Sequence, residues 1–189
     1  RHRPFKVAAD GFWQVHPAAG RAFGAALLDA LRPEPGETAI ALYCGAGLLT
    51  AAVAERVGAS GRVLGVESSP RAVANAATNL AQLPWATVRR GRVDAALVNA
   101  LVAELVAQFE SGPDLVVLDP PRAGAGRDLM QALTALAPRA IGYVACDPAA
   151  LARDVAAAQE AGWRLSALRA FDAFPMTHHV ECVAMLVQR

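Results

Sequence analysis

Short apolar segments rich in β-branched residues alternate along this chain with longer segments of helical periodicity. The expected strands span residues 38–43, 62–67, 86–90, 114–118, 140–145, 165–171 and 180–187. The expected helices span residues 17–31, 48–57, 70–81, 95–109, 126–136 and 149–161. Such alternation predicts an α/β fold in which parallel strands are joined by right-handed helical crossovers. No helix separates the last two strands, so we expect a mostly parallel seven-stranded sheet with an antiparallel C-terminal hairpin.

Composition narrows the class of protein. The 189 residues suit a single globular domain, residues 1–189, and the formal net charge of +1 gives no basic field that would indicate nucleic acid. No apolar run reaches the ~20 residues of a membrane span, and no signal-peptide core follows the basic N-terminus. We therefore expect a cytoplasmic protein without a membrane contact. The three cysteines are widely spaced and form no C-x-x-C pair, which argues against disulfides and against a metal site.

A glycine-rich turn connects the first expected strand of the sheet to the following helix. Residues 39–48 run from the strand through Gly45 and Gly47 into that helix, and the next strand ends at Glu67. Glycines allow a ligand to approach the backbone, and an acidic residue at this distance can bind both hydroxyls of a ribose. Without Glu67, a simple tight turn would be the favoured interpretation. Thr50 replaces the third glycine of a dinucleotide motif, which favours S-adenosylmethionine over NAD.

The strand at 114–118 ends in the stiff sequence Asp119-Pro120-Pro121-Arg122. The Asp119 carboxylate should face the crevice at the carboxyl ends of the strands. The alternative is a rigid turn in which Asp119 only caps the next helix. Methyltransferases that act on exocyclic amino groups usually have an aromatic residue at the fourth position, and RNA cytosine-C5 enzymes usually have a cysteine in this turn. Arg122 fits neither pattern.

Two further residues suit a reaction at C5 of uracil. That carbon accepts a methyl group only after a thiolate has added to C6, and a base must afterwards remove the C5 proton. Cys146 lies between a strand and a helix N-terminus, where the helix dipole should lower its pKa. Glu181 begins an apolar strand, where partial burial should raise its pKa toward that of a useful base. The alternatives are a buried, inert cysteine and an edge-strand carboxylate.

The other chemically notable residues have plainer interpretations. His178 and His179 are adjacent on an extended segment and so point to opposite faces, which favours local hydrogen bonds over metal binding. Cys44 lies in the glycine turn, and we expect it to pack beside a cofactor. Cys182 follows Glu181 in an apolar strand, and we expect it in the core.

Together these residues resemble the RNA 5-methyluridine methyltransferases, which modify tRNA or ribosomal RNA. The resemblance covers nearly the whole chain, from Phe12-Trp13-Gln14-Val15-His16 through the turn at 42–48. It continues through Glu67, Asp119-Pro-Pro-Arg-Ala-Gly, residues 145–154 (Ala-Cys-Asp-Pro-Ala-Ala-Leu-Ala-Arg-Asp) and Phe174-Pro-Met-Thr-His-His-Val-Glu181. The last two stretches are the most specific.

The resemblance implies a Rossmann-like class I fold, S-adenosylmethionine as cofactor and RNA as partner. It implies that Cys146 is the nucleophile and Glu181 the base. Gln14, Tyr43, Glu67 and Asp119, with the two glycines of the turn, would form the pocket for cofactor and target base. We expect residues 1–189 to be the catalytic domain, acting as a monomer without a metal, with the family's N-terminal RNA-binding domains outside this sequence.

One departure from the family pattern keeps other functions open. The family's turn normally begins with Asp, and this chain has Ala41. Ala41 motivates a second hypothesis, a non-catalytic RNA-binding or scaffold protein on the same fold. A third hypothesis is an RNA methyltransferase that acts on another base. The sequence does not specify which RNA or which uridine is the substrate.

Overall fold

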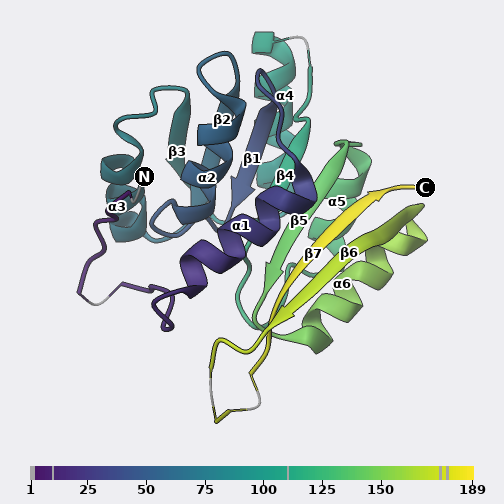
Figure 1. Ribbon diagram of the computed structural model, residues 1–189. Coiled ribbons are helices and arrows are strands. Elements are labelled where there is room, and N and C mark those ends of the chain that lie inside the picture. Colours follow the sequence, from purple (N-terminus) through teal and green to yellow (C-terminus); the bar gives the residue numbers. More distant parts are fainter. Residues whose placement is uncertain (1–2, 10, 110, 175, 178) are drawn as a thin grey trace.

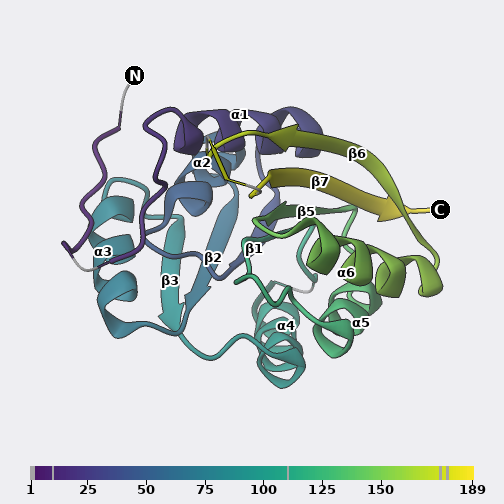
Figure 2. The ribbon, with the colours of Figure 1, turned by 90° about the horizontal axis from the view of Figure 1, so that it is seen from below.

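The alternating pattern folds into one seven-stranded sheet with helices on both faces (Figures 1 and 2). The computed structural model describes residues 3–9, 11–109, 111–174, 176–177 and 179–189. The strands are β1 (Thr38–Leu42), β2 (Arg62–Glu67), β3 (Ala86–Arg90), β4 (Leu115–Leu118), β5 (Ala140–Ala145), β6 (Trp163–Phe171) and β7 (Glu181–Gln188). The helices are α1 (Ala19–Leu31), α2 (Leu48–Val57), α3 (Pro70–Leu80), α4 (Ala95–Phe109), α5 (Arg127–Ala135) and α6 (Pro148–Glu160).

The strands lie in the order β3-β2-β1-β4-β5-β7-β6. β1 to β5 pair in parallel, whereas β7 runs antiparallel to both β5 and β6. The prediction of a mostly parallel sheet with an antiparallel C-terminal hairpin is therefore confirmed. The strand order reverses between β1 and β4, and ligands of open α/β sheets bind beyond the carboxyl ends of the strands at such a point.

Two apolar cores lie on opposite faces of the sheet. Helices α1, α2 and α3 cover one face, and α4, α5 and α6 cover the other (Figure 2). In β1, Ala39 and Ala41 belong to the first core, and Ile40 and Leu42 belong to the second. All four side chains are buried, which explains why the central strands are almost continuously apolar.

The expected boundaries agree with the structure to within two residues. The sequence predicts a strand through Tyr43, but β1 ends at Leu42 because Tyr43 has a φ of 57°, in the left-handed region. Ser69 caps α3: its hydroxyl accepts a hydrogen bond from the Ala72 N–H, and Pro70 occupies the first turn as expected.

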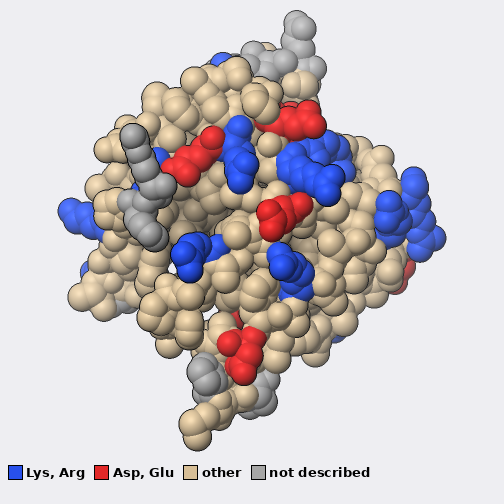
Figure 3. Space-filling view, viewed as in Figure 1, with Lys and Arg blue, Asp and Glu red and all other residues tan. Residues whose placement is uncertain are grey.

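Surface charge gives little indication of function. On the face shown in Figure 3, basic and acidic side chains are interspersed, in keeping with the net charge of +1. Within the part of the chain that the structure describes, no helix is both long enough and apolar enough to cross a membrane.

Candidate active site

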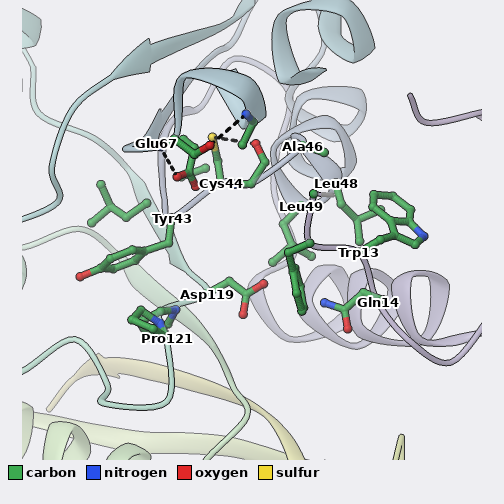
Figure 4. A pocket seen from close by; sticks show the side chains of 18 of the residues that line it. Trp13, Gln14, Tyr43, Cys44, Ala46, Leu48, Leu49, Glu67, Asp119 and Pro121 are labelled. Atoms are coloured by element: carbon green, nitrogen blue, oxygen red, sulfur yellow. Dashed lines mark hydrogen bonds between the residues drawn. The ribbon is translucent and has the colours of Figure 1, made fainter. Parts of the chain in front are cut away.

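A cavity of about 760 Å³ opens at the carboxyl ends of the central parallel strands, a size that suits a cofactor together with a nucleobase. It is lined by seven of the eight predicted site residues: Gln14, Tyr43, Gly45, Glu67, Asp119, Cys146 and Glu181. These residues come from the N-terminal segment, from four strand ends and from the start of β7. Figure 4 shows Glu67 on one side of the cavity, Trp13 and Gln14 on the other, and Asp119 between them.

The acidic end of β2 holds the glycine turn in place. The Glu67 carboxylate accepts hydrogen bonds from the Gly45 N–H at 3.0 Å and from the Ser69 N–H at 2.8 Å (Figure 4). A Cβ atom at Gly45 would meet no atom within 4 Å, so a ligand can approach the turn there. An acidic residue beside open backbone is the arrangement that binds the ribose of a nucleoside.

Gly47 has a different position from the one predicted. It does not line the cavity, and it is the N-cap of α2 with a φ of 89°. A Cβ atom there would lie 3.4 Å from the Ala76 Cβ atom of α3. Gly47 therefore allows the turn to adopt a left-handed conformation close to α3, and its contribution to a binding site is indirect.

Asp119 presents a carboxylate to the cavity rather than to a helix. The next helix, α5, has Gly126 as its N-cap and no side-chain cap, so Asp119 is not a capping residue. Among the described residues its carboxylate has no hydrogen-bond or ion-pair partner. Burial, with the nearby Glu181 carboxylate, raises the pKa of Asp119 to about 7. A cavity wall of this kind fits a ligand that carries a positive charge.

The pairing of β5 with β7 brings Cys146 and Glu181 together. Ala145, the last residue of β5, pairs with Cys182 in the antiparallel register. Cys146 and Glu181 are the next residues beyond this last pair; both line the cavity, and they are close enough for the Glu181 charge to act on the thiol. Cys146 is partly exposed, whereas Glu181 is only 4% exposed, and burial raises the pKa of Glu181 as its sequence context predicts.

The expected lowering of the Cys146 pKa is wrong for the ligand-free cavity. Burial raises the pKa of this thiol, and the carboxylates of Glu181 and Asp119 raise it further. Its own backbone N–H and the Arg122 guanidinium act in the opposite direction but do not outweigh those effects. Negative charges near a thiol disfavour the thiolate, so the ligand-free cavity favours the protonated form of Cys146.

The other two cysteines lie where the sequence places them. Cys44 lines the cavity, and burial together with the Glu67 carboxylate raises its pKa to about 12. Cys182 is 5% exposed and belongs to the core. A thiol with so high a pKa is hardly ionised at neutral pH and is a poor nucleophile there.

An asparagine attaches the N-terminal segment to the glycine turn. The Asn79 side chain pairs with both the N–H and the C=O of Lys6, and its amide also donates to the Ala46 C=O at 2.8 Å. This attachment leads the following residues along the cavity, where Trp13 and Gln14 contribute to its wall. Trp13 also stacks against Phe5, with ring centroids 5.4 Å apart.

Of the two adjacent histidines, the structure describes His179. His178 and Pro175 lie outside the described residues. The Nε2 atom of His179 is 3.4 Å from a guanidinium nitrogen of Arg122, and its ring packs edge-on against Phe174. No group of three or more potential metal ligands occurs within the described ranges.

With this geometry established, the chain can be compared with known proteins. A sequence model of the family described as tRNA (Uracil-5-)-methyltransferase matches residues 6–189. The chain belongs to this family. An uncharacterized RNA methyltransferase of Streptomyces avermitilis is 48% identical over 184 residues, which are 97% of this chain and 41% of that protein. The 23S rRNA (uracil(1939)-C(5))-methyltransferase RlmD of Shewanella sp. is 39% identical, over 92% of this chain and 37% of that protein.

A solved structure confirms the predicted fold class. The Pyrococcus abyssi tRNA (uracil-54, C5)-methyltransferase in complex with S-adenosyl-L-homocysteine superimposes with a TM-score of 0.72 at 28% identity. The match covers 94% of this chain and 40% of that one. The fold is therefore the Rossmann-like fold of S-adenosylmethionine-dependent methyltransferases. The chain spans about two fifths of the length of the proteins that it matches.

Sequence reasoning missed one polar residue close to the site. Asp154 of α6 is 3% exposed and accepts hydrogen bonds from the loop that follows Arg122. The available signal was a charged residue at a core-facing position, because the buried residues Ala150 and Ala158 lie one turn away on either side.

Proposed function

We propose that this chain is the catalytic domain, residues 1–189, of an enzyme that methylates C5 of a uridine in tRNA or ribosomal RNA. The observation that carries the proposal is that Cys146 and Glu181, the residues next to the last β5–β7 pair, line the same cavity as Glu67 and Asp119. Uracil-C5 methylation needs a thiol and a carboxylate at one pocket, and this pocket has both.

The residues of the cavity fit S-adenosylmethionine. Glu67 and the open turn at Gly45 suit a ribose, and Asp119 suits a positive charge. When bound, this cofactor supplies an electrophilic methyl group and the positive charge of its sulfonium. A positive charge in the cavity favours the ionised forms of Asp119 and Cys146, which opposes the effect of the carboxylates on the thiol.

The protein's own groups would then act in sequence. The Cys146 thiolate forms a bond to C6 of the uracil, and the electron pair of the C5–C6 double bond moves to make C5 nucleophilic. After methyl transfer, Glu181 accepts the C5 proton, the double bond re-forms and the C6–S bond breaks. The raised pKa of Glu181 suits a base that must accept a carbon-bound proton.

The substrate must reach a thiol at the edge of a cavity, so a paired uridine would have to leave its stack. The family description and the relatives' names support an RNA substrate, which would place the enzyme in the cytoplasm, and we expect it to act as a monomer. The scaffold hypothesis gains no support, because Ala41 is buried in β1 and the cavity beside it remains open.

The test is to trap the covalent adduct. The complete protein is incubated with S-adenosylmethionine and RNA that contains 5-fluorouridine, and denaturing gels are used to look for a stable protein–RNA species. Fluorine at C5 cannot leave as a cation, so the last step fails and the adduct persists. We expect an adduct that depends on the cofactor, that maps to Cys146 by mass spectrometry and that is lost in Cys146→Ala.

Cys44→Ala is the matched control, because Cys44 lines the same cavity but has a thiol whose pKa is raised to about 12. It should retain the adduct. Absence of any adduct from the wild-type protein with both tRNA and rRNA would overturn the proposal. An adduct on Cys44, or one that survives Cys146→Ala, would overturn the assignment of the nucleophile. Nucleoside mass spectrometry of each RNA would then show whether tRNA or rRNA carries the product.

A further inference from the structure

Asp154 is a buried carboxylate outside the cavity, and the proposed reaction does not use it. Asp154 lies on the core-facing side of α6, among the buried residues Ala150, Leu151, Val155 and Ala158. A carboxylate costs several kcal/mol to bury unless hydrogen bonds replace its hydration. The identity of its partners therefore indicates what the residue does.

All of the partners belong to one loop and one strand. Asp154 Oδ2 accepts hydrogen bonds from the Tyr143 hydroxyl at 2.5 Å and from the Ala125 N–H at 2.7 Å. Its Oδ1 accepts from the Gly126 N–H at 3.0 Å. The Tyr143 oxygen, in turn, accepts from the same Ala125 N–H at 3.2 Å. Two side chains thus hold two successive backbone amides.

The loop is shaped to meet this carboxylate. Gly124 has a φ of 85°, and its N–H donates to the Pro121 C=O at 2.8 Å, which closes a turn. A Cβ atom at Gly124 would lie only 2.7 Å from Asp154 Oδ2. Only glycine allows both the left-handed turn and the close approach of the carboxylate.

The loop is also the continuation of the cavity wall. Asp119 and Arg122 line the cavity, and the held residues Ala125 and Gly126 begin three residues after Arg122 in the same loop. On the other side, Cys146 immediately precedes α6, whose N-cap Asp147 accepts a hydrogen bond from the Ala150 N–H at 2.6 Å. One helix therefore carries the nucleophile at its start and, about two turns later, holds the loop that bears Asp119 and Arg122.

The geometry points to Asp154, together with Tyr143, as a positioning pair that fixes the Asp119–Arg122 turn relative to Cys146. This inference rests on the proposed function for its catalytic consequence, but the anchoring itself can be measured separately. Misplacement of reacting groups by about 1 Å can reduce a rate by about 100-fold.

The experiment compares three variants of the complete protein. Asp154→Asn places an NH₂ donor where three donors now converge, and Tyr143→Phe removes only the hydroxyl. Thr134→Val is the control: it removes a buried hydroxyl whose bonds, to the carbonyls of Met130 and Gln131, stay within α5. Three quantities are measured: single-turnover methylation, S-adenosylhomocysteine binding by calorimetry, and hydrogen exchange of residues 123–126.

We expect Asp154→Asn to reduce the single-turnover rate about 10- to 100-fold and Tyr143→Phe to reduce it less. The dissociation constant for S-adenosylhomocysteine should stay within about twofold of the wild-type value, since Glu67 and the glycine turn lie outside the hydrogen-bond network of Asp154 and Tyr143. Exchange of residues 123–126 should accelerate in both variants but not in Thr134→Val. A purely structural role would instead weaken binding and accelerate exchange throughout α6, and that result would overturn the inference.

Failure of the proposed function gives a different result. If the wild-type protein methylates no uridine, that function fails, yet the anchoring can still be tested by hydrogen exchange and by alkylation of Cys146. Release of the loop moves the Asp119 and Arg122 charges and should change the Cys146 alkylation rate, while the core thiol of Cys182 stays protected. Unchanged exchange and unchanged Cys146 alkylation in Asp154→Asn would refute the positioning pair.

Discussion

The carboxylate of Asp119 should make the ligand-free protein less stable at neutral pH, and Asp119→Asn should restore that stability. In the folded protein, burial and the Glu181 charge raise the pKa of Asp119 from its ordinary value of 3.8 to about 7. Between these two values the folded chain binds a proton that the unfolded chain has lost. The contribution of Asp119 to stability is therefore most favourable below the unfolded pKa and is lost as the pH rises through about 7.

The size of the effect follows from the two pKa values. Each unit of difference corresponds to about 1.4 kcal/mol, so the full cost of ionising Asp119 in the folded state reaches about 4 kcal/mol at high pH. Asp119 retains some contact with the water of the cavity, which makes this value an upper limit. Asparagine does not titrate and has nearly the same shape, so the stability advantage of Asp119→Asn should grow by about 2–3 kcal/mol between about pH 4.5 and about pH 8.

Urea unfolding at several pH values measures this difference, with the fluorescence of the buried Trp163 as the signal. Asp172→Asn, at an exposed carboxylate, is the matched control and should show no such trend. The same variant that gains stability should lose methylation, because Asp119 lines the cavity in which the proposed reaction takes place. A stability difference between Asp119→Asn and wild type that is equal at both ends of the pH range would refute the reasoning.

Three further predictions follow from other parts of the structure. Glu181→Gln removes a carboxylate that raises the Cys146 pKa, so iodoacetamide should alkylate Cys146 about three- to tenfold faster at about pH 8. An equal or slower alkylation rate, measured by mass spectrometry, would contradict this effect of Glu181 on the thiol. Glu67→Ala should weaken S-adenosylhomocysteine binding about 10- to 100-fold in calorimetry, while the far-UV circular dichroism spectrum stays unchanged. An unchanged affinity would mean that Glu67 does not contribute to the binding site. Gly142→Ala should lower the free energy of unfolding in urea by about 1–3 kcal/mol, because the added Cβ would lie 2.5 Å from Leu27 Cδ1 in a fully buried contact. An unchanged free energy of unfolding would mean that α1 can shift away from β5.

The local sequence pattern was sufficient to predict the fold. The seven strands and six helices follow the predicted order because each depends on periodicity and on nearby residues such as Ser69 and Pro70. The placement of Glu67 and Asp119 followed as well, since the ends of parallel strands in one sheet meet at one edge. Tyr43 departs from its predicted strand because the turn requires a left-handed conformation that residue type alone does not signal.

Properties that depend on distant residues were not predictable in the same way. The helix N-terminus near Cys146 suggested a lowered pKa, but the result depends on carboxylates that lie 27 and 35 positions away in the chain. Gly47 was expected at the ligand and instead accommodates Ala76 of α3, a contact that exists only after the helices pack. Asp154 had no predicted role beyond its place in the family resemblance, because its loop partners lie 28 and 29 positions away.

The direction of β7 explains why a residue at the start of a strand can act at the carboxyl edge of the sheet. In a fully parallel sheet, that edge receives residues only from strand ends, as with Glu67 and Asp119. Because β7 runs antiparallel between β5 and β6, its first residue, Glu181, reaches the same edge and lines the same cavity as Cys146. A shift of β7 by one residue would turn the Glu181 side chain to the other face of the sheet. The buried pairing on both sides of β7 therefore fixes the register, and with it the distance between the two groups that the proposed reaction requires.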